Sequence, residues 1–255
     1  MTNTRSPIVL MYHGTPANQP ESHFSIRANL FAKHLDYLTR KGWETVLYRD
    51  LHSGHALPEK AVVLTLDDGY ADNYDGAFLP LVKRGMKATW FITTDCIGGN
   101  AYWLESQSDQ SQILTTSQLA EMHAAGMEIA SHTCSHPDLS RLSLEEQLPE
   151  LSRSKKMLED LLSSPVLSLA YPFGRFNADS LVAAEQCGYR SACTTRPGWL
   201  GSEKNPFMVR RIAIFSGDSI STLARKLAFA DNDVSWKKIA SYYASRARDA
   251  LSSHL

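Results

Sequence analysis

Residues 62–73 read VVLTLDDGYADN, in which a run of apolar and β-branched residues meets two adjacent carboxylates, Asp67 and Asp68, and then a glycine. Such a run is typical of a buried strand. Two like charges at the end of a buried strand repel each other, and each resists losing its water. A bound metal ion is the strongest remedy, because its charge is opposite to theirs. The stretch therefore predicts a strand that delivers reactive groups to one end of a sheet.

Strand-like and helix-like segments alternate along the rest of the chain. We expect strands at 8–13, 62–68, 87–94, 127–132, 165–174, 191–195 and 209–215. We expect helices at 31–42, 76–85, 115–126, 143–162, 178–188 and 219–229. About seven βα-like repeats with short connections predict an α/β fold with a mainly parallel sheet, either a barrel or a doubly wound sheet. In both architectures the reactive groups lie at the C-terminal ends of the strands.

The helix expected at 143–162 carries two opposing signals. Ser143 and Glu146 form a Ser-x-x-Glu capping box, which marks a helix start. Pro149 follows about two turns later, and proline removes one backbone hydrogen bond of a helix. We therefore expect a kink or a break at Pro149.

The chain reads as one domain. Residues 1–234 contain no linker, low-complexity tract or repeat that would mark a second domain. Residues 235–255 predict a separate amphipathic helix, with Trp236 and Tyr243 on one face. We expect this helix to dock on the same domain, and contact with a partner or a membrane surface is the alternative.

Composition excludes several classes of protein. The 255 residues are 43% hydrophobic with a net charge of −1, so no overall positive field favours nucleic acid or an anionic membrane. The N-terminus lacks a secretory apolar region, and no segment approaches the roughly 18 apolar residues of a membrane-spanning helix. We expect a cytoplasmic protein without a transmembrane segment. The four cysteines form no C-x-x-C pair, which favours free thiols, and no pattern indicates an oligomeric state.

Two histidines complete a candidate metal site. SHTCSH follows a predicted strand and places His132 and His136 four residues apart. One aspartate and two histidines form a three-ligand set that leaves positions for water and substrate, as catalytic sites do. Both imidazoles reach one ion if the segment forms a helical turn, and Cys134 then points about 200° away from His132. The second aspartate is free to take a proton from water that the metal has made more acidic.

Each motif alone also has a plainer interpretation. Adjacent aspartates at the end of a strand often form a turn or cap a helix. Histidines four residues apart are often surface or core residues. The combination of both motifs is much less easily produced by chance, and it favours the metal site.

At this point TLDDGYADN, SHTCSHPDLS and LAYPFG resemble the polysaccharide deacetylase family, also called the NodB homology domain or carbohydrate esterase family 4. The resemblance covers roughly residues 60–195. It implies a distorted (β/α) barrel of about seven strands in a single domain. It also implies Asp67 as the catalytic base and Asp68, His132 and His136 as metal ligands. Zn²⁺ is the expected ion, and Co²⁺, Ni²⁺ or Fe²⁺ also suit these ligands.

The third motif departs from the family pattern. Many members carry an arginine where this chain has Ala170, two positions before Pro172. Arg211 resembles an arginine of relatives with this variant and is expected to brace Asp67, with Arg175 as a weaker alternative. Tyr171 matches the position whose backbone N–H helps to hold the oxyanion.

The residue expected as the catalytic acid also departs from the family pattern. Many members end in an L-x-H motif, which this chain lacks. A permuted subgroup opens instead with a YH strand, and LMYHG matches it, so His13 is the expected acid. That subgroup includes deacetylases of surface polysaccharides and of poly-N-acetylglucosamine. Trp103 either offers a sugar-stacking surface or is a core residue.

The resemblance implies a hydrolase that removes an acetyl group from an N-acetylated sugar or saccharide, with O-acetyl groups as a variant. The first alternative is an amidohydrolase that acts on a small non-sugar amide or a cyclic ureide. The second is a binding module with an inactive deacetylase fold. The expected partner is an acetylated sugar or oligosaccharide, and not nucleic acid.

Overall fold

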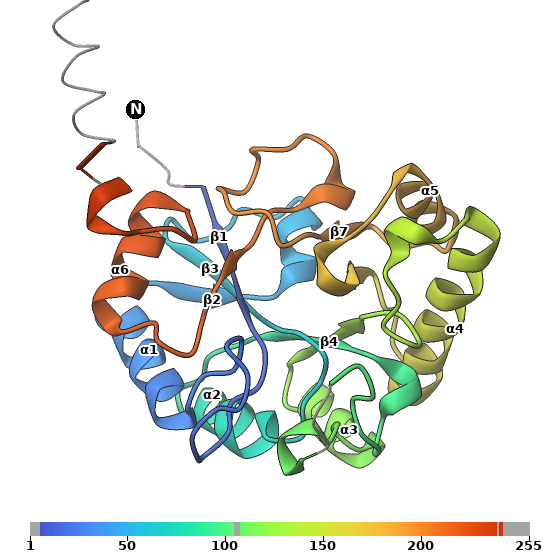
Figure 1. Ribbon diagram of the computed structural model, residues 1–255, viewed down its shortest axis with the longest axis horizontal. Helices are drawn as coiled ribbons and strands as arrows, with labels where there is room; N and C mark the ends of the chain where they lie inside the picture. Colours follow the sequence, from blue (N-terminus) through green and yellow to red (C-terminus); the bar gives the residue numbers. More distant parts are fainter. Residues whose placement is uncertain (1–5, 105–107, 239, 242–255) are drawn as a thin grey trace, which may run out of the picture.

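The computed structural model describes residues 6–104, 108–238 and 240–241, and its centre is a curled parallel sheet (Figure 1). All paired neighbours in this eight-stranded sheet run parallel. The strands are β1 (Ile8–Tyr12), β2 (Glu44–Val46), β3 (Ala61–Leu66), β4 (Thr89–Ile92), β5 (Glu128–Ser131), β6 (Ser168–Ala170), β7 (Ser191–Cys193) and β8 (Ile212–Ala213). The strand β2 is the one strand that the sequence analysis did not predict.

The two ends of the sheet meet at Val209. The strand order is β7-β6-β5-β4-β3-β1-β8, with β2 paired to β3 outside this path. Val209, just before β8, donates its N–H to the carbonyl of Ala192 in β7 at 3.0 Å, and its own carbonyl accepts from Thr194 at 2.8 Å. These bonds draw β8 and β7 together. The α/β fold and the distorted barrel in a single domain are thereby confirmed.

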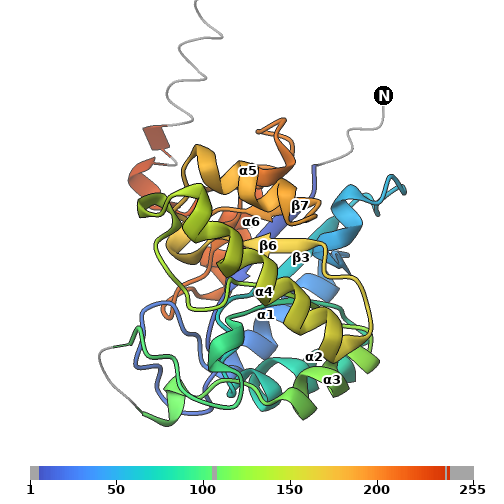
Figure 2. The ribbon, with the colours of Figure 1, turned by 90° about the vertical axis from the view of Figure 1, so that its right-hand side faces the viewer.

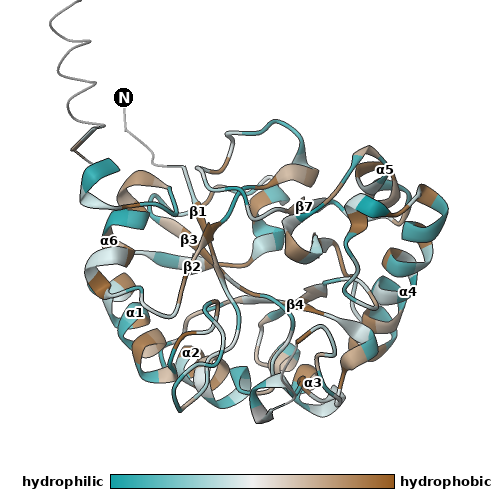
Figure 3. Cartoon of the chain, in the orientation of Figure 1, coloured by the Kyte–Doolittle hydropathy of each residue, from teal (hydrophilic) through white to brown (hydrophobic). Residues whose placement is uncertain are grey.

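Among the described residues, the six α-helices with assigned bounds lie around the strands (Figure 1). They are α1 (Ala28–Arg40), α2 (Leu79–Lys83), α3 (Thr116–Ala124), α4 (Leu144–Leu162), α5 (Ala178–Gln186) and α6 (Ile220–Phe229). Figure 2 shows α4 crossing the outer side of the sheet beside β6. The helices are amphipathic, and Figure 3 shows hydrophobic and hydrophilic residues alternating along them. In α1 the buried residues Phe31, Leu35 and Leu38 recur at helical spacing, so this face packs inward.

Alternate residues of the central strands pack on opposite sides of the sheet. Ile8 and Val62 belong to the large cluster that includes the helices. Val9 and Val63 belong to a smaller cluster with Phe91 inside the barrel. Because both sides are covered, β1 and β3 are almost entirely apolar rather than alternating, which is why VVLTL has no exposed polar face.

The parallel arrangement brings the polar strand ends together. His13 follows β1, Asp67 and Asp68 follow β3, and His132 follows β5. Neighbouring strands are in direct register, with Tyr12 opposite Leu66 and Ile92 opposite Ser131. All four side chains therefore emerge at the same rim of the barrel.

Two expectations about helices have different outcomes. The cap of α4 is confirmed, because the side chain of Ser143 accepts from the N–H of Glu146. The expected break at Pro149 is wrong, since α4 continues through it over 19 residues, held by its buried apolar face.

The expected C-terminal helix at 235–255 falls largely on residues 239 and 242–255, which lie outside the described residues. It stays a prediction, as does the domain boundary at 234. Within the described residues, the structure has no helix with the length and hydrophobicity required to span a membrane. All four cysteines are free.

Candidate metal centre and active site

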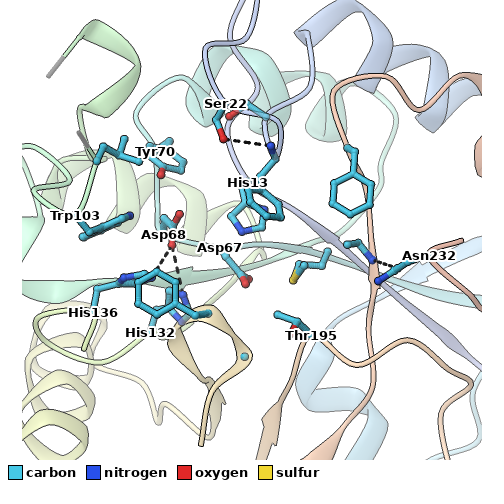
Figure 4. A pocket seen from close by; sticks show the side chains of 18 residues that line it. His13, Ser22, Asp67, Asp68, Tyr70, Trp103, His132, His136, Thr195 and Asn232 are labelled. Atoms are coloured by element: carbon cyan, nitrogen blue, oxygen red, sulfur yellow. Dashed lines mark hydrogen bonds and ion pairs between the residues drawn. The ribbon is translucent and has the colours of Figure 1, made fainter. Parts of the chain in front are cut away.

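The two adjacent aspartates point in different directions because the chain turns sharply between them. Asp67 continues the sheet, and its N–H donates to the carbonyl of Tyr12 at 3.0 Å. Asp68 has a left-handed backbone with φ of 72°, a conformation that aspartate tolerates better than most residues. Gly69 follows with φ of 85°. This turn separates the two carboxylates (Figure 4) and gives them different partners.

Asp68, His132 and His136 form a buried group with the geometry of a metal site. Their ligand atoms all lie within 4.8 Å of one another. Asp68 Oδ1 is 3.4 Å from His132 Nε2 and 3.3 Å from His136 Nε2. Two ligand atoms at ordinary Zn²⁺ distances in a tetrahedral arrangement lie about 3.3–3.5 Å apart. These residues therefore fit a tetrahedrally coordinated divalent ion.

The protonation states in this group also suit a cation. His132 Nδ1 is 2.8 Å from the carbonyl oxygen of Ala170, which only accepts, so Nδ1 carries a proton and Nε2 is the nitrogen available to bind an ion. Burial raises the pKa of Asp68, but the imidazoles of His132 and His136 outweigh burial and hold it well below its ordinary value. Burial lowers the pKa of His136, which favours the neutral imidazole that metals bind.

The segment that carries the two histidines is not the helical turn that we expected. Thr133 and His136 instead have left-handed backbones, with φ of 70° and 56°. The N–H of His136 donates to Thr133 Oγ1 at 3.0 Å and closes this tight loop. The loop brings both Nε2 atoms to Asp68. Cys134 is buried outside this group, and its N–H donates to Glu150.

Asp67 forms a fully buried ion pair with Arg211. Arg211 Nη1 and Nη2 donate to the two carboxylate oxygens, each at 2.6 Å. The guanidinium is itself fixed by the carbonyl of Thr194 at 2.9 Å and Thr65 Oγ1 at 3.1 Å. Burial raises the pKa of Asp67, but Arg211 outweighs burial and lowers it, so Asp67 stays ionised. Arg175, the alternative brace, pairs with Asp138 instead.

His13 lines the same cavity and is held through its backbone. Asn73 Nδ2 donates to the carbonyl of His13 at 2.9 Å, and Asn73 Oδ1 accepts from Trp90 Nε1 at 3.1 Å. The imidazole packs against Phe24 at 5.2 Å between ring centroids. Its Nδ1 is buried, without a hydrogen-bond partner among the described residues. Burial lowers the pKa of His13, and the carboxylates of Asp68 and Asp67 oppose that shift.

The expected oxyanion role of Tyr171 is wrong. Its N–H donates to the carbonyl of Cys193 at 3.2 Å, as part of the pairing between β6 and β7. The residue is fully buried, outside the lining of the cavity. The N–H that the resemblance assigned to the oxyanion is therefore already hydrogen-bonded within the sheet.

The candidate site opens into a cavity of about 460 Å³ (Figure 4). Two phenylalanines on its wall are half-exposed, Phe24 at 47% and Phe173 at 51%. Trp103, expected as a sugar-stacking or a core residue, lines the cavity and stacks on His136. Asn232, which follows α6, lines the opposite side.

Three of these lining residues were not expected from the sequence. Phe173 lies in the AYPFG stretch, and nothing in that stretch predicts its left-handed backbone conformation, with φ of 57°. Phe24 and Asn232 lie in loops without a recognisable pattern.

Comparison with known proteins gives consistent matches. Residues 54–192 match the sequence profile of a family described as polysaccharide deacetylase. The chain is 32% identical to the Bacillus subtilis protein YxkH, which is named after that family, over 83% of this chain and 72% of YxkH. It is 24% identical to a poly-beta-1,6-N-acetyl-D-glucosamine N-deacetylase of Staphylococcus aureus, over 66% of this chain and 59% of that protein.

Solved structures agree in fold. The Streptococcus pyogenes deacetylase PplD, in complex with acetate, superimposes with a TM-score of 0.75 and 29% identity, over 87% of this chain and 98% of PplD. A polysaccharide deacetylase from Bacillus cereus also gives a TM-score of 0.75, with 25% identity over 89% of this chain and 70% of that one.

Proposed function

Because the chain belongs to the polysaccharide deacetylase family, we propose that it is a metal-dependent hydrolase that removes the acetyl group from an N-acetylated sugar or saccharide. One observation carries this proposal. The buried Asp68, His132 and His136 group lies next to an ionised carboxylate, Asp67, at the wall of an open cavity. A metal-ligand set beside a carboxylate that is not itself a ligand is the arrangement that hydrolysis of an amide by metal-activated water requires.

Asp68, His132 and His136 are the proposed ligands, and Zn²⁺ is the proposed ion. Co²⁺, Ni²⁺ and Fe²⁺ share the preference for imidazole and carboxylate ligands. When bound, such an ion supplies Lewis-acid chemistry, which polarises a carbonyl and makes water more acidic. Three protein ligands leave room for substrate and water on the cavity side.

Asp67 is the proposed base. Each of its oxygens accepts one hydrogen bond from Arg211, and a carboxylate oxygen has a further lone pair that can accept a proton from water. Arg211 keeps the carboxylate ionised and fixes its orientation. The base is therefore ready without rearrangement when water adds to the carbonyl carbon of the acetyl group.

His13 is the proposed acid. Since its Nδ1 is buried, we assign the proton transfer to Nε2, which delivers a proton to the departing nitrogen as the C–N bond breaks. The products are acetate and an amino sugar. In place of Tyr171, we propose that the N–H of Phe173 faces the developing oxyanion. That residue lines the cavity, and its N–H makes no backbone hydrogen bond to a described residue outside its own turn, Pro172–Gly174.

The saccharide class is supported by the aromatic rings around the site. Half-exposed phenylalanines offer flat apolar surfaces of the kind that ligand sites use. The Staphylococcus aureus relative, by its name, acts on a polymer of N-acetylglucosamine. We therefore favour an N-acetylated hexosamine unit within a saccharide over a small non-sugar amide.

The test is acetate release from N-acetylglucosamine oligosaccharides, compared with small acylated amines and a cyclic ureide, each with and without a chelator. We expect acetate from the oligosaccharides, lost on chelation and restored by Zn²⁺. Turnover of only the non-sugar amides would replace the proposed substrate. An inactive binding module would release no acetate from any substrate.

A further inference from the structure

The two proposed histidine ligands are supported in different ways. His132 is fixed by a hydrogen bond from Nδ1 to the carbonyl of Ala170. The Nδ1 of His136 is equally buried, but it has no hydrogen-bond partner among the described residues. Metal-binding histidines almost always use the second nitrogen to fix the orientation of the ring. Some other contact must therefore hold the imidazole of His136.

Two aromatic rings enclose His136. The ring of Trp103 stacks on it with centroids 4.2 Å apart and an interplanar angle of 18°. The ring of Phe173 packs edge-to-face with the imidazole, with centroids 4.5 Å apart and an interplanar angle of 72°. These contacts restrict the tilt of the imidazole, and the indole face also favours the positive charge that an imidazole acquires on binding a cation.

The backbone that carries two of these three rings is in an energetically unfavourable conformation. His136 has φ of 56° and Phe173 has φ of 57°, both in the left-handed region that side chains with a Cβ rarely adopt. Such conformations persist only where surrounding contacts impose them. The packing of the three rings is one such contact.

Trp103 and Tyr70 also line the cavity together with the third proposed ligand, Asp68. Burial raises the pKa of the Tyr70 hydroxyl, and the negative charge of Asp68 raises it further. Tyr70 and Trp103 belong to one apolar cluster beside the site (Figure 4).

We propose that Trp103 is a positioning residue for the metal site, and that its ring holds His136 in the ligating orientation in place of the missing hydrogen bond. This inference rests on the proposed metal site, and it assigns Trp103 a role apart from sugar stacking. Removal of the ring frees the imidazole to rotate, so the site loses affinity for metal even though all three ligands remain.

The experiment measures Zn²⁺ affinity by competition with a chromophoric chelator, and the visible absorption spectrum of the Co²⁺-loaded protein. The variants are Trp103→Leu, which removes the ring, and Trp103→Phe, which keeps a ring but lacks the indole N–H. Trp199→Leu is the matched control, because Trp199 is half-buried like Trp103 but lines a different hollow.

We expect Trp103→Leu to bind Zn²⁺ about 10–100-fold more weakly than wild type, which is the usual cost of losing a group that orients a metal ligand. We expect a changed Co²⁺ spectrum for Trp103→Leu, and near-wild-type affinity for Trp103→Phe and Trp199→Leu. Unchanged affinity in Trp103→Leu would overturn the inference, even with a raised KM for saccharide. Equal weakening in Trp103→Phe and Trp103→Leu would also overturn it, because the ring would then not be the cause. Wild-type protein that binds no metal would overturn the proposed function itself.

Discussion

Arg211 and Asp67 are 144 positions apart in the chain, yet they form a bidentate ion pair at the centre of the barrel rim, with both N–O distances at 2.6 Å. Arg211 is fully buried. It approaches Asp67 from the segment before β8, because the barrel brings β8 next to β1 and β1 next to β3. The brace that is missing near AYPFG therefore comes from the opposite end of the strand order.

This pair predicts strong coupling in stability. Arg211→Met leaves Asp67 as a buried carboxylate without a partner, which costs about 3–5 kcal/mol of unfolding free energy. In the double variant with Asp67→Asn no charge is left unpaired, so it should lose clearly less than the sum of the two single changes. Urea unfolding of the metal-free proteins measures this cycle. Additive losses would contradict a direct pair.

Asp67→Asn separates the base from the ligands. The change removes the group that takes the proton of water, so we expect kcat to fall by about 10²–10⁴-fold. Zn²⁺ affinity should stay near the wild-type value, because Asp67 is outside the ligand group. Measuring kcat and bound metal on the same preparation tests both statements. A loss of metal that parallels the loss of rate would make Asp67 a ligand instead.

His13→Ala tests the proposed acid through the leaving group. An amine leaves only after it gains a proton, whereas 4-nitrophenolate leaves without one. We expect a loss of about 10²–10⁴-fold in deacetylation of an N-acetylated oligosaccharide and a much smaller loss with 4-nitrophenyl acetate. The ratio of the two rates is the measurement. Equal losses with both substrates would remove His13 as the acid.

His34 makes stability depend on pH away from the site. Burial lowers the pKa of His34 to about 4, although the hydrogen bond to the carbonyl of Asp218 opposes this shift. In the neutral ring Nε2 donates to that carbonyl and Nδ1 accepts from the Tyr12 hydroxyl. Above pH 6.5 the residue is neutral in both states. As the pH falls, the unfolded chain takes up the proton first, so stability is lost between about 6.5 and 4. The loss amounts to about 3 kcal/mol.

The comparison with His34→Gln isolates this effect. Burial raises the pKa of Asp72 to about 6, which works in the opposite direction over the same range, so total stability alone is not diagnostic. Glutamine does not titrate. The variant should therefore lose less stability than wild type between pH 7 and pH 4, as measured by urea unfolding. Parallel curves for the two proteins would contradict a neutral buried His34.

The sequence was sufficient for features that depend on neighbouring residues. The apolar strands, the cap at Ser143 and the aspartate and histidine motifs are local patterns, and the parallel sheet brings the strand ends together without further information. The partnership of Arg211 with Asp67 is not local, and only the family resemblance suggested it.

Features that depend on backbone conformation or on hydrogen-bond partners were beyond the sequence. Thr133 and His136 adopt left-handed conformations that their residue types do not indicate, so we wrongly expected a helical turn. The N–H of Tyr171 was assigned to the reaction, although its pairing with Cys193 leaves it unavailable. The break expected at Pro149 is absent, because the packing of α4 outweighs the local cost of the proline. The rings that enclose His136 come from separate loops, and only the folded chain reveals that contact.

The central claim is that Asp68, His132 and His136 hold one divalent ion that deacetylation requires. The most direct measurement is acetate release from an N-acetylglucosamine oligosaccharide as Zn²⁺ is titrated into chelator-treated protein, for wild type and for Asp68→Asn. We predict that wild-type activity is absent at the start, rises linearly and saturates at a single ion per chain, whereas Asp68→Asn stays inactive throughout. Full activity of the metal-free wild type, or equal recovery by Asp68→Asn, would contradict the account.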